Sequence, residues 1–379
     1  MSSLSFSNHL TFQDKPHGMS HCSFCGKAGE LLPCSCGKVS YCGPACQKSG
    51  WPLHRLACPL VACRSVEGRG LALLATRRIR PGRRLVLEEP LLTFAGKDMN
   101  LFLETFAKLA SEKKLLFLSL YDPGPASDSK KEDGAEKLEK LIKDSFSDQD
   151  GLLIMKGLQA WRILWVNGVS VGQLGEEKIK AVYPTVSRIN HSCGANAVFG
   201  LVGETLTMAI TAIQEIAKGE EVTLNYIGTE GLLASQLERR RQLERSWGFR
   251  CSCRVCGLEA EDLARNERQR KELRGYKEEV ARWVKPDVES VTKALEISLR
   301  RMDTMREMGM EVVAALPYAL VEAYGQAKAV WWWGGEPVMS PGCLLEEATS
   351  LAAILGPSVQ RLVREAREEV DIVIEGWRQ

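Results

Sequence analysis

The sequence predicts an α+β protein made of a small zinc-bound module, a β-rich central domain and a helical C-terminal region. Three observations predict this order. Seven of the 13 cysteines crowd into residues 22 to 58, short β-type runs alternate with Gly and charge between residues 68 and 226, and apolar side chains recur at helical spacing beyond Glu261. The length of 379 residues is sufficient for two or three such domains.

Composition and charge narrow the class of protein. Hydrophobic residues make up 45% and charged residues 26% of the chain, and the formal net charge is only +2, which indicates a globular protein with no general attraction to nucleic acid or anionic membranes. No apolar run approaches the roughly 20 residues of a membrane span, and the polar N-terminus lacks the features of a secretory signal. We therefore expect a cytoplasmic or nuclear protein without a membrane partner, in which clustered cysteines bind metal.

The first cysteine cluster offers seven thiols and one imidazole, enough for two closed tetrahedral zinc sites. Small spacings let one turn of the chain present two ligands to one ion, and zinc supplies folding energy that so short a segment cannot obtain from a core. A set of buried free cysteines is the weaker interpretation, because a histidine stands at ligand spacing among them. The ligand pairs are Cys22-x2-Cys25, Cys34-x-Cys36, Cys42-x3-Cys46 and His54-x3-Cys58.

This segment resembles the MYND zinc finger, whose pattern includes YC-x3-C-Q-x4-W-x2-H-x3-C. One residue rather than two separates the third and fourth ligands here, and Cys36 keeps the usual distance before Cys42, so the departure falls on Cys34. The matching residues are Tyr41, Cys42, Cys46, Gln47, Trp51, His54 and Cys58. The resemblance implies two interleaved sites, with Cys22, Cys25, Cys42 and Cys46 around one zinc and Cys34, Cys36, His54 and Cys58 around the other.

A second cluster reads Cys251-x-Cys253-x2-Cys256. Three closely spaced thiols cannot close a tetrahedral zinc site alone, so a fourth ligand must come from elsewhere. Cys193, which ends the sequence Asn-His-Ser-Cys, is the natural donor if the chain folds back.

The central part alternates strands with helices. Strand-like runs LALLAT and RLVLEEPLL flank a turn at Pro81-Gly82, and helical sequence follows from about residue 98 to 165, with a helix expected around Ala135 to Lys143. The runs AVFGLV, ETLTMAI and EVTLNYI are again β-type. A basic helix is expected near Leu232 to Trp247, and we interpret its arginines 239 to 241 as a solvated helix face.

Several of these motifs resemble the SET domain of protein-lysine methyltransferases. RINHSCGANA, GEEVTLNYIG and GFRCSC-x2-C resemble the SET core and its post-SET zinc segment, and GRGLALLATRRIRPG resembles the first SET strands. With the finger, the match is to the SET-and-MYND class over roughly residues 22 to 256. The implied organisation is a flexible N-terminus (1–20), a finger (21–60), a SET domain (64–228) with a helical insertion around 98–165, a helix and post-SET segment (229–258) and a C-terminal domain of four or five helices (259–379).

The resemblance implies methyl transfer from S-adenosylmethionine to lysine, with three zinc ions that are structural. This reaction needs a deprotonated amine, although free lysine titrates near about 10.4. An apolar, aromatic channel disfavours the ammonium form, and catalysis is mainly a matter of aligning nitrogen, methyl and sulfur.

By similarity, the hydroxyl of Tyr226 lies beside the transferring methyl and acts through orientation and electrostatics. Asn190 and His191 are expected to hold the adenine and the ammonium end of the cofactor. Tyr226 and His191 also have structural alternatives. Tyr226 could be an ordinary core tyrosine, and His191 could be a buried histidine whose hydrogen bonds are all made within the protein. Their positions in the motifs favour a role in the site.

Further site residues are implied at both ends of the expected pocket. Arg69 lies between Gly68 and Gly70, which allow close approach of the backbone to the cofactor. Phe249 either lines the lysine channel and cofactor pocket or simply packs the post-SET segment. The other candidates are Asn167, Ser187 and Trp247 for the cofactor and Tyr183 for the wall of the lysine channel.

The chain also departs from the family. Ala195 replaces a proline before Asn196, and Gly228 stands where the class often has Asp. The finger precedes the GRG strands, whereas in the best-known members it follows them inside a split SET domain. Substrate identity is therefore not transferred from those members.

Two other functions compete with the enzyme. A non-catalytic adaptor would use the finger to bind a Pro-containing peptide and keep the SET fold as a scaffold. The presence of Gly68, Gly70, Asn190, His191 and Tyr226 favours the enzyme, with a lysine-containing protein as partner and a monomer as the expected state. Direct DNA binding is the weakest reading, because no basic recognition helix accompanies the zinc ligands.

Overall fold

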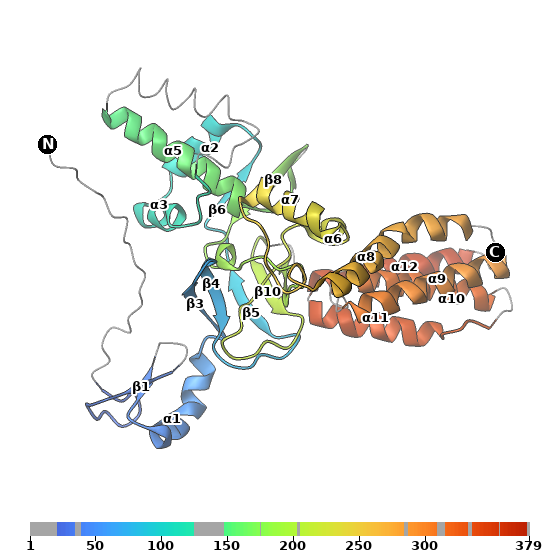
Figure 1. Cartoon of the computed structure of the whole chain (residues 1–379), viewed down its shortest axis with the longest axis horizontal. Coiled ribbons are helices and arrows are strands. Elements are labelled where there is room, and N and C mark those ends of the chain that lie inside the picture. Colours follow the sequence, from blue (N-terminus) through green and yellow to red (C-terminus); the bar gives the residue numbers. More distant parts are fainter. Residues whose placement is uncertain are drawn as a thin grey trace.

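A computed structural model describes residues 21–34, 39–124, 148–174, 176–202, 205–283, 287–308, 315–332, 336–355 and 357–376. A finger and a helical bundle project from a central β-rich domain in different directions (Figure 1). The expected flexible N-terminus, the helix around Ala135 to Lys143 and the ligand Cys36 lie outside the described residues. No helix in the described ranges is long and apolar enough to cross a membrane.

The finger has almost no apolar core of its own. Strands β1 (Leu32–Pro33) and β2 (Ser40–Tyr41) pair antiparallel and lead into helix α1 (Pro44–Ala57). The hydrophobic cluster of the finger consists of Cys34 and Cys58, against which Val39 and Trp51 pack, and Cys22 and Tyr41 are buried beside their own ligand and strand neighbours. So small a core cannot hold a fold together, which leaves metal ligation as the main source of its stability.

The central domain begins with a hairpin of β3 (Val61–Val66) and β4 (Gly70–Ala75). Two three-stranded antiparallel sheets follow, and all three sheets surround one buried cluster that includes Leu73, Ile189 and Ile210. β3 begins at Val61, three residues before the expected start of this domain, because its ladder to β4 starts there. The sheets have the orders β5 (Arg84–Glu88), β10 (Met208–Ala212), β9 (Ala197–Leu201) and β6 (Leu92–Ala95), β8 (Glu177–Val182), β7 (Val169–Leu174).

Two details differ from the sequence expectations. β7 and β8 form where no β-type run was identified in the sequence. The run EVTLNYI forms no continuous strand, because it passes between two partners and pairs with each through a single bridge, Leu74 with Glu221 and His191 with Leu224. This passage brings the segment before Tyr226 against the Asn-His-Ser-Cys turn.

The predicted helical insertion is confirmed in the described residues as α2 (Met99–Ala107), α3 (Ser111–Leu118) and α5 (Asp148–Asn167). Phe102 and Phe117 are completely buried in an aromatic cluster that also contacts Trp161. This cluster holds the C-terminal end of α5 against the central sheets.

The predicted basic helix forms as α7 (Gln236–Trp247), which starts four residues later than expected and follows a separate short helix, α6 (Gly228–Leu232). Ser235 caps α7 in a reciprocal capping box with Glu238. Gly248, with φ 74°, ends α7 and turns the chain toward the second cysteine cluster.

The C-terminal region is helical, as predicted. α8 (Ala260–Val280), α9 (Val288–Glu307), α10 (Ala315–Trp332), α11 (Pro341–Leu355) and α12 (Pro357–Gly376) form the bundle in the described part of the chain, with a short 3-10 turn at Ala281–Trp283 (Figure 1). Its core is continuous with the second cysteine cluster through Leu273 and Leu295. The bundle is therefore packed onto the metal-ligand segment rather than tethered to it.

Candidate cofactor cavity and metal centres

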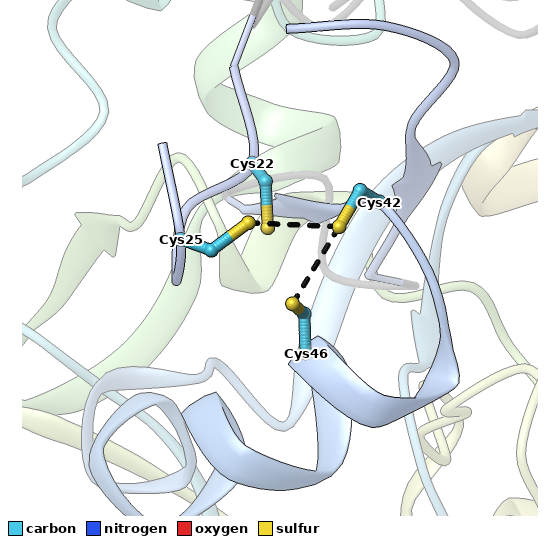
Figure 2. A group of neighbouring side chains, drawn as sticks. All are labelled: Cys22, Cys25, Cys42 and Cys46. Atoms are coloured by element: carbon cyan, nitrogen blue, oxygen red, sulfur yellow. Dashed lines mark hydrogen bonds between the residues drawn. The ribbon is translucent and has the colours of Figure 1, made fainter. Parts of the chain in front are cut away.

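The first group of finger ligands converges on one point. Figure 2 shows the thiols of Cys22, Cys25, Cys42 and Cys46 facing one another. The sulfur atoms of Cys25 and Cys42 lie 3.6 Å apart, and those of Cys42 and Cys46 lie 3.5 Å apart. Zinc–sulfur bonds of about 2.3 Å in a tetrahedron place sulfurs roughly 3.8 Å apart, so this group fits a zinc ion.

The second finger group contains Cys34, His54 and Cys58. Nε2 of His54 lies 3.4 Å from Sγ of Cys34. The structure thus places Cys34, the ligand that departs from the family pattern, with the predicted imidazole. Three of the four predicted ligands are gathered, and the fourth is Cys36, which lies outside the described residues.

The second cluster closes as expected when the chain folds back. Cys193 joins Cys251, Cys253 and Cys256, and all four are buried. Sγ of Cys193 lies 3.6 Å from Sγ of Cys256, and the backbone N–H of Cys193 donates to Sγ of Cys253. These four residues, called the post-SET cluster below, fit a four-thiolate zinc site.

His191 connects the post-SET cluster to Tyr226. Its Nδ1 accepts the backbone N–H of Tyr226 at 3.1 Å, so the proton of the neutral ring sits on Nε2, which lies 3.4 Å from Sγ of Cys193. Burial lowers the pKa of His191 to about 4, which keeps the ring neutral at physiological pH. The histidine therefore transmits the position of a metal ligand to the tyrosine.

The arginine run on α7 corrects a sequence interpretation. Arg241 is exposed, but Arg239 is completely buried, with Nη2 3.8 Å from Sγ of Cys256 and Nη1 donating to the carbonyl of Ala234 at 2.6 Å. Arg240 donates to the carbonyls of two cluster cysteines. The predicted solvated face is wrong for these two residues, because α7 lies on the post-SET cluster and turns one helix face inward.

The charge of the neighbouring thiols explains why a guanidinium group is tolerated beside the post-SET cluster. Burial lowers the pKa of Arg239, but the nearby charge of Cys193 and Cys256 outweighs this effect and raises the pKa. Arg270 on α8 is also buried, and burial lowers its pKa to about 10, so that it stays charged at neutral pH. Arg270 donates to the carbonyl of Leu232 and to Oδ1 of Asn266.

A cavity of about 830 Å³ gathers the predicted cofactor residues from distant parts of the sequence. Its wall is formed by the turn before β4, the end of α5, the segment that leads into the Asn-His-Ser-Cys turn, the segment EVTLNYI and the chain between α7 and the post-SET cluster. Among the lining residues are Gly68, Arg69, Gly70, Asn167, Ser187, Asn190, His191, Tyr226, Trp247 and Phe249.

Tyr226 stands in an aromatic part of this wall. Its hydroxyl donates to the carbonyl of Ile189 at 2.6 Å, and its ring centroid lies 5.3 Å from that of Trp247 and 6.4 Å from that of Phe249. Burial, followed by the charge of Glu221, raises the pKa of Tyr226 above its ordinary value. The hydroxyl is therefore a neutral donor at physiological pH, which suits an orienting role.

The two glycines beside Arg69 have a backbone reason to be glycine. Gly68 and Gly70 have φ of 69° and 70°, a region that disfavours other residues. No protein atom lies within 4 Å of a Cβ built on either one, so the space beside them is open toward the cavity.

Glu221 holds the cofactor-side loops together, a role that motif matching did not assign. Its carboxylate pairs with Arg69 at 3.2 Å and accepts from Nδ2 of Asn190 at 2.8 Å. Arg69 also donates to the carbonyl of His191. The only sequence signal was its place at the start of EVTLNYI, and its partners became apparent only after folding.

Asn167, Ser187 and Trp247 act mainly as parts of the wall. Nδ2 of Asn167 donates to the carbonyls of Tyr121 and Ile163, and Nε1 of Trp247 donates to the carbonyl of Val166. Ser187 donates to the backbone carbonyl of Asn167. These bonds fix the end of α5 against the rest of the cavity.

Tyr183 was expected to form a wall of the lysine channel. The residue is completely buried in the central core, and its hydroxyl donates to the carbonyl of Leu206 at 2.6 Å. It is absent from the described residues that line the cavity, whereas Phe249 is present. The place of Tyr183 in the wall of the lysine channel therefore stays a prediction.

Sequence reasoning missed a second part of the wall, supplied by the helical insertion and the neighbouring strands. Nζ of Lys180 lies 4.7 Å from the ring centroid of Trp165, and both residues line the cavity together with Tyr121, Arg188 and Phe199. No motif marks these positions, because ordinary strand and helix residues reach the cavity only through the packing of the insertion.

Comparisons with known proteins agree with this geometry. A family model described as MYND finger matches residues 22–58, and one described as SET domain matches residues 68–227. The two matches cover the finger and the segments that supply the glycine turn, the Asn-His-Ser-Cys turn and Tyr226.

Among curated relatives, the N-lysine methyltransferase SMYD2 of Homo sapiens is 32% identical over 258 residues, which is 65% of this chain and 53% of that protein. The histone-lysine N-methyltransferase ASHR1 of Arabidopsis thaliana is 30% identical over 253 residues, 62% of this chain and 46% of that protein. The chain thus spans about half the length of the curated relatives it matches.

A solved structure of the SET domain of LSMT bound to lysine and AdoHcy aligns over 88% of this chain and 92% of that chain, at 16% identity and a TM-score of 0.33. So distant an overlap adds nothing to the assignment, which stands on the sequence matches.

Proposed function

The chain is a SET-domain protein with a MYND finger ahead of the SET domain, and we propose that it transfers a methyl group from S-adenosylmethionine to lysine side chains of proteins. One observation carries the proposal. The glycine turn, Asn190, His191 and Tyr226 come from separate motifs, yet they line one cavity of about 830 Å³. A cavity of this size suits a small-molecule cofactor.

S-adenosylmethionine would supply a methyl group on a cationic sulfur. The protein's part is to position the acceptor nitrogen and to favour its neutral form. Trp247 and Phe249 surround Tyr226 with aromatic surface, and such surroundings lower the pKa of an amine by disfavouring its charged form. Tyr226, held through its bond to the Ile189 carbonyl, orients the reacting groups without acting as a base.

The cofactor side depends on the loops around Glu221. Because this carboxylate holds Arg69 and Asn190 together, the glycine turn and the Asn-His-Ser-Cys turn form one wall. A preformed wall reduces the ordering cost of binding.

In this mechanism the metal ligands take no part in the methyl transfer. The two finger groups and the post-SET cluster would hold three zinc ions with protein ligands, as structural sites do. The finger contributes no described residue to the cavity wall, whereas the chain through Cys251 and Cys253 is part of it.

The decisive experiment measures cofactor binding first and transfer second. The purified full chain is titrated with S-adenosylmethionine by calorimetry, and then incubated with radiolabelled cofactor, mixed histones and cell lysate. We expect saturable binding and labelled protein bands. Absence of binding would reject the enzyme, and binding without any labelled lysine would favour the adaptor.

Three further properties stay predictions: a Pro-containing peptide bound at the finger, a monomeric state, and a cytoplasmic or nuclear location. Size-exclusion chromatography with light scattering tests whether the protein is a monomer.

A further inference from the structure

We propose that one part of the cavity binds acidic side chains of the protein substrate, through Lys180 of β8 and Arg188, with the ring of Trp165 beside the lysine. These three residues are called the cationic subsite below. The proposal rests on the proposed function and adds a substrate class to it: proteins in which Asp or Glu lies close in sequence to the methylated lysine.

The first step concerns the charge of the cavity wall. Among the described residues that line the cavity, four carry a positive charge and none is a carboxylate: Arg69, Lys180, Arg188 and Arg250 are the cations. Within the same part of the chain, only Arg69 has a carboxylate partner, Glu221, which holds the cofactor-side loops together. A cavity lined by charges of one sign concentrates molecules of the opposite charge.

The second step concerns the partners of the two cations. Nζ of Lys180 lies 4.7 Å from the ring centroid of Trp165 and 3.4 Å from the carbonyl oxygen of Gly168. Nη2 of Arg188 donates to Oγ of Ser119 at 3.3 Å, while its buried Nε has no hydrogen-bond partner in the described ranges. Both side chains are partly buried. Their charges therefore lack a counter-ion among the described residues, and a bound carboxylate would supply one.

Exposed aromatic surface accompanies the two cations. Trp165, in the last turn of α5, is 39% exposed and Phe199 of β9 is 42% exposed, and both line the cavity. Open aromatic faces suit the main chain and apolar side chains of a peptide. The cationic subsite therefore fits a peptide segment that carries negative charge better than a free inorganic anion.

The cofactor leaves these positive charges uncompensated. S-adenosylmethionine has one carboxylate but also an ammonium and a sulfonium group, so it adds net positive charge to a wall that is already cationic. The substrate lysine adds no negative charge of its own. Acidic side chains beside that lysine are the remaining source of countercharge, whereas basic neighbours would be repelled.

The test uses matched lysine peptides as probes. Each fluorescent peptide has one central lysine in a neutral background, and one flanking position at a time carries Asp, Asn or Lys. Binding to the full chain is followed by fluorescence polarisation, with S-adenosylhomocysteine present to prevent turnover. At the favoured position, the Asp peptide should bind about fivefold more tightly than the Asn peptide, and the Lys peptide more weakly than either. Equal binding of the three peptides at every position would overturn the proposal.

Two variants remove the charges one at a time. Lys180→Gln and Arg188→Gln should each lose most of the preference for Asp over Asn, because affinity for the Asp peptide falls further. Lys178→Gln and Arg241→Gln are controls, since both residues are exposed and neither lines the cavity. A wild-type preference in both subsite variants would overturn the proposal, and so would an equal loss in the controls.

Charge reversal separates recognition from folding. Lys180→Glu should bind the Lys peptide more tightly than the Asp peptide, an inversion that a merely structural role of Lys180 would not produce. An unchanged order of affinities in this variant would overturn the proposal, and the comparison remains decisive if Arg188→Gln fails to fold.

The cofactor is the control ligand for the same variants. In calorimetry, Lys180→Gln should weaken binding of S-adenosylmethionine less than fluorescence polarisation shows for the Asp peptide. The reverse order would assign the cation to the carboxylate of the cofactor and overturn the proposal.

Methyl transfer is measured on the same peptides, so that failure of the subsite and failure of the enzyme stay distinct. A preference for acidic peptides without any transfer would reject the enzyme and keep the subsite. Transfer with the same KM for the Asp and Asn peptides would keep the enzyme and overturn the subsite.

Discussion

Tyr226 and His191 depend on each other at the level of single atoms. The backbone of Tyr226 donates to Nδ1 of His191, and its hydroxyl donates to the carbonyl of Ile189. The tyrosine is thus held at both ends by the segment that carries Cys193. A small displacement of that segment would move the hydroxyl, so the phenol should respond to changes outside the cavity.

Replacing Tyr226 with Phe removes the hydroxyl and keeps the ring. We expect the fold to survive with a loss of about 1 kcal/mol, because one buried hydrogen bond is lost, and turnover to fall at least about tenfold. Radiolabelled methyl transfer and thermal unfolding measure the two effects.

Tyr276→Phe is the matched control, because it also removes a buried hydroxyl contact, to Ser298 in the bundle. It should lose comparable stability and keep its turnover. Unchanged turnover in Tyr226→Phe would contradict the orienting role.

The ionisation of Tyr226 gives a pH prediction. Burial raises the pKa of Tyr226 in the folded protein above the pKa of about 10 that it has in the unfolded chain. The folded state therefore keeps its full stability while the phenol is neutral in both states. It loses stability as the pH rises above the unfolded pKa, because the unfolded chain then ionises first. Between pH 7 and 9 we therefore expect no change in turnover from this group. A difference absorbance titration of the wild type against Tyr226→Phe measures the ionisation, and a phenolate at pH 8 would refute the neutral donor.

Glu221→Gln tests the pairing of the cofactor loops. The amide would keep a contact to Asn190 but lose the charge that holds Arg69, so S-adenosylmethionine should bind several-fold more weakly. Calorimetry measures the affinity. Glu215→Gln breaks an exposed pair with Arg78 outside the cavity and should change nothing; equal weakening in both variants would point to a general charge effect.

At the scale of elements, α7 has a role that its composition conceals. The helix is rich in arginine and would suit a solvated surface, yet one face carries Arg239 and Leu243, both completely buried. Its start is fixed by the capping box of Ser235 and Glu238. A well-defined start sets the rotation of the helix and therefore which arginine meets the post-SET cluster.

Ser235→Ala should destabilise the protein by about 1 kcal/mol, because the first turn of α7 loses its cap. Chemical denaturation measures the change in the free energy of unfolding. Arg241→Ala, on the exposed face of the same helix, should stay within about 0.5 kcal/mol of the wild type. An equal loss of stability in Ser235→Ala and Arg241→Ala would show that the cap does not stabilise the helix.

At the scale of the whole molecule, the three metal groups divide into two classes. The two finger groups lie on a projection beside the central domain (Figure 1), and the post-SET cluster lies between that domain and the bundle. The cavity wall includes the chain of the post-SET cluster and no described residue of the finger. Loss of metal should therefore have different consequences in the two places.

Cys193→Ser should lower the zinc content from three ions to two and weaken cofactor binding together, since His191 and the cavity wall lose their support. Cys25→Ser should also lose zinc, but leave cofactor affinity within about twofold, because the finger stands apart from the cavity. Metal analysis and calorimetry on the same samples measure both. Three zinc ions in Cys193→Ser would contradict the shared site.

Much of this organisation could be predicted because it depends on short stretches of chain. The spacing of Cys22 and Cys25, or of Cys251 and Cys253, places two ligands on one turn whatever surrounds them. Helical periodicity likewise predicted a helical C-terminal region. The resemblance of the motif at Asn190 and His191 to the SET core implied a place in the cofactor pocket, and both residues line the cavity.

The tertiary structure decided which side chains are buried and what compensates their charge. Tyr183 is buried with its hydroxyl on the carbonyl of Leu206, Arg239 faces thiols instead of water, and Glu221 joins two loops that are distant in sequence. The physical reason is that ligand spacing is a property of a few consecutive bonds, whereas burial and charge pairing depend on how separate elements pack. The sequence by itself therefore determined the ligand pairs, the domain order and the motif of the cavity. Only packing determined that α7 turns the buried Arg239 toward Sγ of Cys256.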